Sequence, residues 1–213
     1  KVITDRLAAS LKPGHPAPSL PAVKPITKSK TIHIPMHSQQ STILVATTGL
    51  PAGDTPTLMP VKVANYALGG GDLVSALSLV VRQQHGLVYG IDSAFDSYAQ
   101  GGMFVISAQT KHQSADQAVS LIQSTLAHYR EDGPTVAQYN LAKRYLADVF
   151  PLGIATNGAV LTTLSRLQFY HYPSNYLSEY VDRINAVTRE QAKLAFRHAT
   201  AHPIITIVAG GEG

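Results

Sequence analysis

The chain of 213 residues contains no cysteine and only 14% charged residues. Without cysteine it can form no disulfide, thiolate-held zinc site, iron–sulfur cluster or cysteine nucleophile, and this absence favours neither an oxidising nor a reducing compartment. No stretch approaches the roughly 18 apolar residues of a transmembrane helix. At 45% hydrophobic residues, the chain is too apolar to be disordered. Its length predicts one large domain or two small ones with a buried core.

The net charge of +4 is confined to the N-terminal part of the chain. Residues 1–30 carry six basic residues and one acidic residue, so the rest of the chain has a net charge of −1. A groove that follows a phosphate backbone needs basic residues clustered on a folded face. We therefore predict no nucleic-acid partner.

Nine of the 13 prolines lie between Pro13 and Pro60, and five of them fall within residues 13–25. Such a segment is stiff and extended and has no hydrophobic period. We therefore predict that residues 1–28 are a linker or the tail of a preceding domain, and that residues 29–213 form one folded domain. The chain opens on Lys1 with neither a methionine nor a signal-peptide pattern, as expected of a processed or trimmed fragment.

Hydrophobic spacing predicts strands, then a run of helices, then a returning strand, which indicates an α+β fold with an antiparallel β-sheet packed on several helices. Gly101-Gly102 is a predicted hairpin turn. Asp72 is expected to cap a buried helix that Gly86 ends. Capping boxes are predicted at Thr135 with Gln138 and at Thr188 with Gln191. The predicted strands are residues 31–37, 42–48, 87–99, 103–110 and 204–209, and the predicted helices are residues 58–68, 73–84, 114–130, 136–149, 156–170, 175–184 and 189–199.

Histidine pairs give the first candidates for chemistry. His33 and His37, like His198 and His202, have the i, i+4 spacing of zinc ligands on a helix. Neither pair stands in an H-E-x-x-H or H-x-x-E-H motif, so we predict no metal site in this chain. The serine motif G-x-S-x-G is missing too, and no Lys-Ser/Thr follows the glycine triplet Gly69–Gly71. No catalytic residue is predicted in this chain alone.

Arg82 and Tyr89 give the stronger candidate. A buried helix ends at Arg82, a glycine turn follows, and Tyr89 comes seven residues later on a strand. Across such a connection the two side chains could meet at one rim, where a guanidinium and a phenol donate hydrogen bonds to a peptide carbonyl. The alternative is structural. Arg82 would complement the helix dipole, and Tyr89 would pack on the same strand face as Leu87 and Ile91.

Residues 66–90 resemble the signature of the non-catalytic C-terminal domain of the pitrilysin/insulinase-type zinc metallopeptidases, the inverzincins. The signature is a leucine with glycines, a helix, an arginine, a Gly-Leu pair and a Tyr-Gly pair. Further matches follow in order over about residues 30–211. They include Gly53-Asp54, Ile106–Thr110, Gly133-Pro134-Thr135, Phe150-Pro151-Leu152, Tyr176-Leu177, Ala186–Gln191 and Ile207–Gly211.

The resemblance implies a fold and a role. The α+β domains of this family form a clamshell, and zinc is held by H-x-x-E-H in a different domain or subunit. Arg82 and Tyr89 match the family's Arg/Tyr pair, which binds the substrate peptide near that zinc. Gly69, Gly70 and Gly71 resemble a short form of its glycine-rich loop. Phe150-Pro151-Leu152 resembles the inactive subunit of bacterial two-subunit members, which implies a heterodimer with a zinc-bearing subunit, often in the periplasm.

The sequence departs from the family pattern beside Arg82. Ala76 and Val81 replace an arginine and an acidic residue, and Gln84-His85 replaces a more basic pair. These changes remove salt bridges that would hold the helix end and the orientation of Arg82. Arg82, Gly86, Leu87 and Tyr89 are themselves retained.

Three functions remain open at this point. The leading one is a non-metal-binding half of a bipartite zinc peptidase that hydrolyses nothing alone. The second is a structural or assembly module of the same fold, in which Arg82 and Tyr89 only pack. The third is the C-terminal part of a single-chain peptidase whose zinc motif lies upstream of Lys1.

Overall fold

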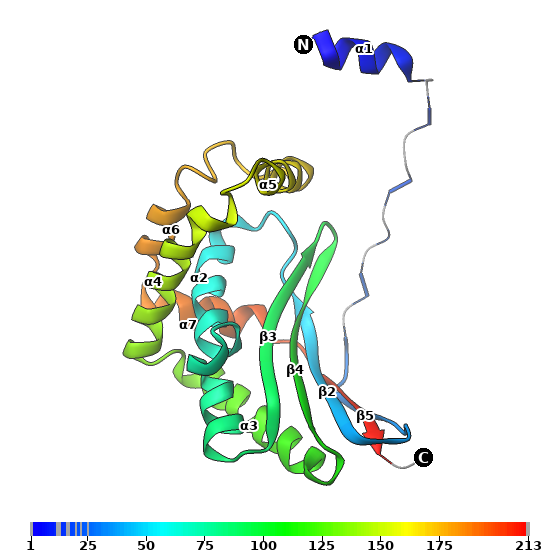
Figure 1. The fold of residues 1–213 in the computed structure, drawn as a ribbon, viewed down its shortest axis with the longest axis vertical. Coiled ribbons are helices and arrows are strands. Elements are labelled where there is room, and N and C mark those ends of the chain that lie inside the picture. The colour runs from blue at the N-terminus through cyan, green and yellow to red at the C-terminus, as the bar shows by residue number, and fades with distance from the viewer. Residues whose placement is uncertain are drawn as a thin grey trace.

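The computed structural model describes residues 2–11, 14–15, 18–19, 21, 23–24 and 26–211, apart from the side chain of Thr55. Two strands are followed by helical segments, a hairpin, a run of five helices and a final strand (Figure 1). The strands are β1 (Lys30–Ile34), β2 (Ser38–Gly49), β3 (Val88–Tyr98), β4 (Gly101–Lys111) and β5 (Ile205–Gly211). The α-helices are α1 (Val2–Ser10), α2 (Thr55–Asn65), α3 (Ala115–Asp132), α4 (Val136–Gly153), α5 (Asn157–Phe169), α6 (Tyr180–Ala186) and α7 (Arg189–Ala199). The shorter helical turns are η1 (Tyr66–Gly70), η2 (Asp72–Val74), η3 (Ser78–Gln84) and η4 (His112–Ser114).

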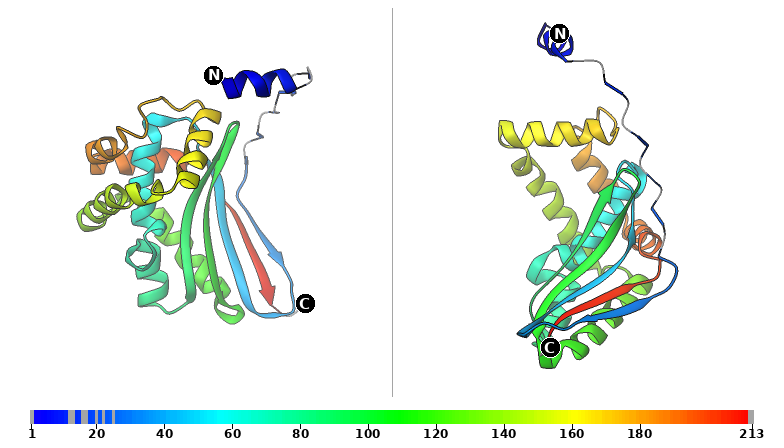
Figure 2. Two further views of the ribbon diagram at one scale, coloured as in Figure 1. Left: turned by 45° about the horizontal axis from the view of Figure 1, so that its top comes forward. Right: turned by 90° about the vertical axis from the view of Figure 1, so that its right-hand side faces the viewer.

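The five strands form one sheet in the order β1-β5-β2-β4-β3. β2, β4, β3 and β5 pair antiparallel, while β1 pairs parallel with β5, so the sheet is mixed at one edge. Apart from α1, the helices lie on one face of this sheet, as Figures 1 and 2 show. The α+β prediction is therefore confirmed. The one parallel pair comes from the returning strand, which lies between β1 and β2.

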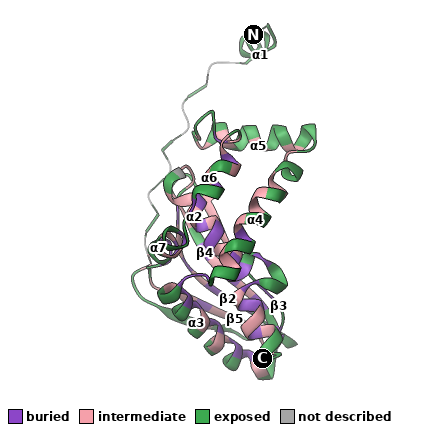
Figure 3. Cartoon of the chain, turned by 90° about the vertical axis from the view of Figure 1, so that its left-hand side faces the viewer, coloured by how far each residue is buried: buried purple, intermediate pink, exposed green. Residues whose placement is uncertain are grey.

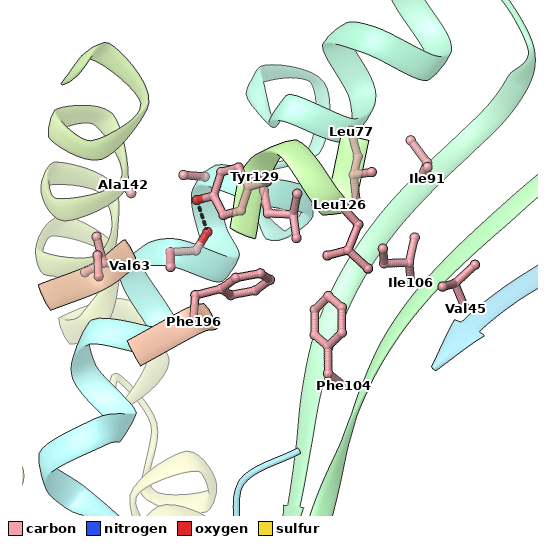
Figure 4. Packing of buried hydrophobic residues seen from close by; sticks show 14 of the residues in the cluster. Val45, Val63, Leu77, Ile91, Phe104, Ile106, Leu126, Tyr129, Ala142 and Phe196 are labelled. Carbon is pink, nitrogen blue, oxygen red and sulfur yellow. Dashed lines mark hydrogen bonds between the residues drawn. The ribbon is translucent and has the colours of Figure 1, made fainter. Parts of the chain in front are cut away.

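The core lies between the sheet and the helices and is centred on aromatic side chains (Figure 4). The ring of Phe196 from α7 contacts Phe104 of β4 edge to face, with 5.4 Å between centroids, and Tyr129 of α3 in the same way at 5.2 Å. The Tyr129 hydroxyl donates a 2.7 Å hydrogen bond to the carbonyl of Ala64 in α2. This contact ties α2, α3, α7 and the sheet into one core.

Two helices differ from that packed arrangement. No residue of α1 is buried, and α1 stands apart from the sheet and helices in Figures 1 and 2. Residues 1–28 were predicted as a linker or tail, and the helix within them was not predicted. α5 also has no buried residue and is drawn almost entirely as exposed in Figure 3. It forms one wall of a hollow that Lys62 of α2 also lines.

Capping residues fix the ends of α4 and α7. Thr135 with Gln138, and Thr188 with Gln191, form the predicted capping boxes, with both side chains bonded to backbone N–H groups. α6 is shorter than predicted, because the chain from Pro173 to Glu179 makes turns before the helix begins at Tyr180. The predicted helix over residues 175–184 is therefore right in its second half only.

Thr188→Ala is expected to lower the free energy of unfolding by about 1 kcal/mol, because the Thr188 hydroxyl accepts a hydrogen bond from the Gln191 N–H (3.2 Å) and alanine cannot replace it. Urea denaturation measures the change. Thr188→Ser keeps the hydroxyl and is the matched control. Equal stability of both variants would show that the cap contributes nothing to the domain.

Candidate functional site

The segment from Tyr66 to Tyr89 positions the candidate site. The buried helix begins after Ser75, whose hydroxyl accepts a hydrogen bond from the Ser78 N–H (3.3 Å) and donates to the carbonyl of Asp72 (2.7 Å). The prediction that Asp72 caps this helix is therefore wrong, and Leu73 and Val74 are exposed rather than buried. Asp72–Val74 forms a separate turn because Ser75 is extended (φ −75°, ψ 154°).

The helix carrying Arg82 ends in a wide turn. Residues 78–84 are π-helical, a conformation often found at functional sites. Gly86 then adopts φ +62°, which glycine tolerates and most other residues do not. Its N–H donates to the carbonyl of Arg82 (3.0 Å), and the N–H of Leu87 donates to that of Val81 (3.1 Å). The prediction that Gly86 ends this helix is confirmed.

Arg82 is partly buried at the end of this helix. It lines a shallow hollow with Leu73, Val74, Leu79 and Gln83. Within the part of the chain that the structure describes, its guanidinium makes no hydrogen bond or ion pair, so its donors are available to a ligand. Arg82 thus lies beside the exposed apolar side chains of Leu73 and Val74.

Tyr89 is 53% exposed and lies where the ladder between β3 and β4 is interrupted. The register shifts between Val88 and Gly90, a β-bulge that leaves Tyr89 without a partner residue on β4. It lines a polar hollow at the ends of β2 and β4, together with residues 37–40 and 111–113. Tyr89 therefore does not share the buried face of Ile91, as the packing alternative requires.

Arg82 and Tyr89 are not in contact. Among the described residues no hydrogen bond or cation–π contact joins them, and each lines a different hollow. The two side chains therefore present separate donors on either side of the Gly86 turn. A substrate that used both would have to cross this turn.

The glycine triplet is packed between elements. Gly69 and Gly70 belong to the π-helical turn η1, and Gly69 and Gly71 are buried while Gly70 is exposed. A Cβ on Gly69 would lie 2.7 Å from the backbone nitrogen of Ser93 in β3. Ser93 is itself held there by Asn65, whose amide donates to its carbonyl (2.9 Å) and accepts from its hydroxyl (2.8 Å). Close approach of η1 and β3 is sufficient to explain a glycine at position 69.

Gly69→Ala is expected to lower the free energy of unfolding by about 1–3 kcal/mol, because the added methyl group would meet the β3 backbone, which cannot move without breaking the sheet. Thermal and urea unfolding measure the loss. Gly158→Ala is the control, because no atom lies within 4 Å of its added Cβ. A Gly69→Ala variant as stable as the native chain would refute this packing role.

Metal ligands are not assembled. No group of three or more histidine, aspartate or glutamate side chains among the described residues is placed to hold a metal ion. His33, His37, His198 and His202 are exposed, with the first pair at the end of β1 and the second at the end of α7.

No helix within the described ranges is long and apolar enough to cross a bilayer.

A third hollow was not predicted from the sequence. It lies between α2, β3, α5 and the turns before α6, and Lys62 and Arg166 line it. Burial, and secondly the charge of Arg166, lowers the pKa of Lys62 to about 8. Burial raises the pKa of Tyr176 beside it. Lys62 lies on a helix whose residues are mostly buried or half-buried, but the sequence analysis did not distinguish it from a solvated lysine.

Comparison with known proteins places the chain in a family. Residues 2–146 match the peptidase M16 inactive domain family. The chain is 27% identical over 152 residues to an uncharacterized zinc protease of Mycobacterium bovis, and 26% identical over 154 residues to another of Bacillus subtilis. These alignments cover 71% and 72% of this chain but only 34% and 37% of the relatives.

Solved structures agree with that match. The peptidase M16 inactive domain from Pseudomonas fluorescens superposes with a TM-score of 0.90 at 29% identity, covering all of this chain and 50% of that one. The periplasmic protease PqqL of Escherichia coli superposes with a TM-score of 0.73 at 16% identity, covering 97% of this chain and 24% of the other, and shows the shared fold alone.

The chain is thus an inactive domain of a zinc peptidase family. It belongs to the peptidase M16 inactive domain family, which confirms the resemblance found in the sequence. It spans about a third of the length of the curated relatives it matches.

Proposed function

We propose that this domain binds substrate peptide through Arg82 and Tyr89 for a zinc site held on another domain or subunit. The observation that carries the proposal is the state of these two side chains. Each belongs to a matched family motif and has its polar group free of internal bonds: the Arg82 guanidinium has no charged partner among the described residues, and Tyr89 is 53% exposed at a bulge.

The chemistry divides between this chain and its partner. Zinc on the partner supplies Lewis acidity and an activated water. Arg82 donates charged hydrogen bonds to a substrate carbonyl, and the Tyr89 hydroxyl orients the peptide or donates to the oxygen that becomes negative in the tetrahedral intermediate. Because the two donors lie on either side of the Gly86 turn, an extended peptide would contact them at separate positions.

The partner is either a zinc-bearing subunit or a zinc-bearing domain of the same gene product. The chain covers only 34% and 37% of the length of the two relatives, which is compatible with both arrangements. We propose the two-subunit arrangement in the periplasm, which the residues Phe150-Pro151-Leu152 favour by resemblance. Fractionation of cells that express the full gene product, followed by immunoblotting, tests the compartment, and recovery in the cytoplasm would refute it.

A three-arm peptidase assay tests the function. A quenched fluorescent peptide library is incubated with this chain, with the zinc-bearing partner, and with both. We expect hydrolysis only when both are present, because the zinc and the Arg/Tyr donors then face one substrate. If the partner alone is equally active, or if the two do not associate, the domain is a structural module and the proposal is wrong.

A further inference from the structure

The hollow beneath α5 has the size of a small-molecule site. Its volume is about 480 Å³, within the range of about 300–1,000 Å³ that ligand pockets occupy. α2 forms one wall through Leu58, Val61, Lys62 and Asn65, and α5 forms the opposite wall. Lys62 and Arg166 are the two charged residues that line it, and neither aspartate nor glutamate does.

Lys62 is a cation with no counter-ion among the residues that the structure describes. Its ammonium lies 4.9 Å from the ring centroid of Tyr180 and makes one long hydrogen bond, 3.4 Å, to the hydroxyl of Tyr176. An ammonium has three donors, so its hydrogen-bonding capacity is largely unused. The one ion pair found in the described ranges joins Arg183 to Glu179 and leaves Lys62 unneutralised.

Arg166 adds a second positive charge from the facing helix. Its guanidinium lies 6.0 Å from the Tyr170 ring centroid, and within the described part of the chain no carboxylate pairs with it. The charge of Arg166 lowers the pKa of Lys62, so the two cations act on each other across the hollow. Like charges that converge on one space are stabilised by an anion placed between them.

The other residues that line the hollow determine which kind of anion fits it. Leu58, Val61, Phe95 and Leu167 give the hollow an apolar wall, with tyrosines beside Lys62. A free phosphate has no apolar part, so it would leave this wall without a matching contact. A carboxylate with an apolar body matches both the charge and the wall.

We propose that this hollow binds a monocarboxylate with an apolar body, its carboxylate between Lys62 and Arg166 and its apolar part against Leu58, Phe95 and Leu167. The same chemistry is present in a free aliphatic or aromatic acid and in the C-terminal carboxylate of a peptide that ends in an apolar residue. The site is separate from the Arg82 and Tyr89 hollows, so the proposal does not rest on the proposed function.

Calorimetric titration of the whole chain tests the site. The probes are 3-phenylpropionate and its uncharged amide, and the peptide acetyl-Ala-Leu-Phe as free acid and as C-terminal amide. We expect each acid to bind at least tenfold more tightly than its amide, because only the acid pairs with the two cations. Binding by the peptide acid alone identifies a peptide terminus as the source, and binding by phenylpropionate identifies a free acid.

Substitutions of the two cations test whether the acid binds in this hollow. Lys62→Met and Arg166→Gln are each expected to weaken binding of the acid at least tenfold. Arg166 is exposed, so Arg166→Gln keeps the test decisive even if Lys62→Met fails to fold. Lys143→Met is the matched control, because Lys143 also lies over a tyrosine ring but lines a different hollow.

Three results would overturn the proposal. The first is equal affinity for an acid and its amide, and the second is no binding of any acid at millimolar concentration. The third is native affinity in the folded Arg166→Gln and Lys62→Met variants. Loss of acid binding with full peptidase activity in the reconstituted complex supports this site and leaves the proposed function intact, so the two ideas fail separately.

Discussion

Arg82→Ala is expected to lower the turnover of the complete peptidase about ten- to a hundredfold without unfolding the domain. A charged hydrogen bond to substrate is worth about 1.5–3 kcal/mol, and each factor of ten in rate corresponds to about 1.4 kcal/mol. Because the guanidinium of Arg82 makes no hydrogen bond or ion pair within the described residues, its removal breaks no side-chain bond of the domain. Steady-state kinetics of the reconstituted complex, with circular dichroism of the variant, measures both effects.

Arg197→Ala is the matched control for this experiment. Like Arg82, Arg197 is a basic residue in the last turn of a helix, so both variants lose the same favourable interaction with the helix dipole. Arg197→Ala is expected to keep native turnover. Full activity in folded Arg82→Ala, or a loss of stability in place of turnover, would support the structural module instead.

Tyr89→Phe isolates the hydroxyl group. It keeps the ring and its surface contacts, so a fall in turnover of about tenfold would be due to the lost donor. Tyr98→Phe is its control, since Tyr98 is 60% exposed at the other end of β3. Equal turnover in both phenylalanine variants would show that the phenol has no role in catalysis.

Local sequence signals predicted most of the secondary structure. The β3–β4 hairpin, the amphipathic helix α3 and both capping boxes appear as expected, because each depends on residues close in sequence. The prediction that Gly101-Gly102 forms the hairpin turn is wrong, because the turn lies at Ala99-Gln100 and the two glycines begin β4. Another prediction that was wrong concerns a feature that depends on contacts between residues far apart in the sequence. Parallel pairing of β1 with β5 joins Lys30 to Ile205, and no local pattern records it.

For the candidate site, the sequence predicted the elements that carry Arg82 and Tyr89 but not the geometry between them. Gly86 ends the helix as its sequence context indicates. Arg82 lies at the end of this helix and Tyr89 lies on the strand that follows, as expected. The β-bulge that exposes Tyr89 is a property of the β3–β4 register, which the alternation of residues along β3 does not reveal. The hollow at Lys62 depends on α5 and the turns before α6 lying opposite α2, so it could not be predicted from α2 alone.

Lys62→Met is expected to raise the free energy of unfolding at pH 7, by an amount that falls as the pH approaches 10. Burial and the charge of Arg166 lower the pKa of Lys62 in the folded chain from 10.5 to about 8. At about 1.4 kcal/mol per pKa unit, the buried charge destabilises the fold by up to roughly 3 kcal/mol. Methionine fills a similar volume with no charge and removes this penalty.

The direction of the pH effect follows from the two protonation states. Below pH 8 Lys62 is charged in both the folded and the unfolded chain, so the folded chain bears the whole penalty. Between pH 8 and 10.5 the folded chain releases the proton first, and the native protein gains stability relative to the variant. The advantage of Lys62→Met is therefore largest at pH 7 and smallest at pH 10. Tyr176 and Tyr180 do not reverse this trend, since burial raises the pKa of both and both are present in the native and the variant chain.

Urea denaturation of native and variant chains at pH 7, 8.5 and 10 measures the difference. Lys143→Met is the control of opposite sign, because the Lys143 ammonium donates to the carbonyls of Asn185 (2.6 Å) and Val187 (3.0 Å), and its loss should destabilise the domain. A Lys62→Met variant that is less stable than the native chain at pH 7 would show that the ammonium is well compensated where it lies. A stabilised variant that no longer binds the carboxylate would show that Lys62 is retained at a cost to stability because the ligand needs its charge.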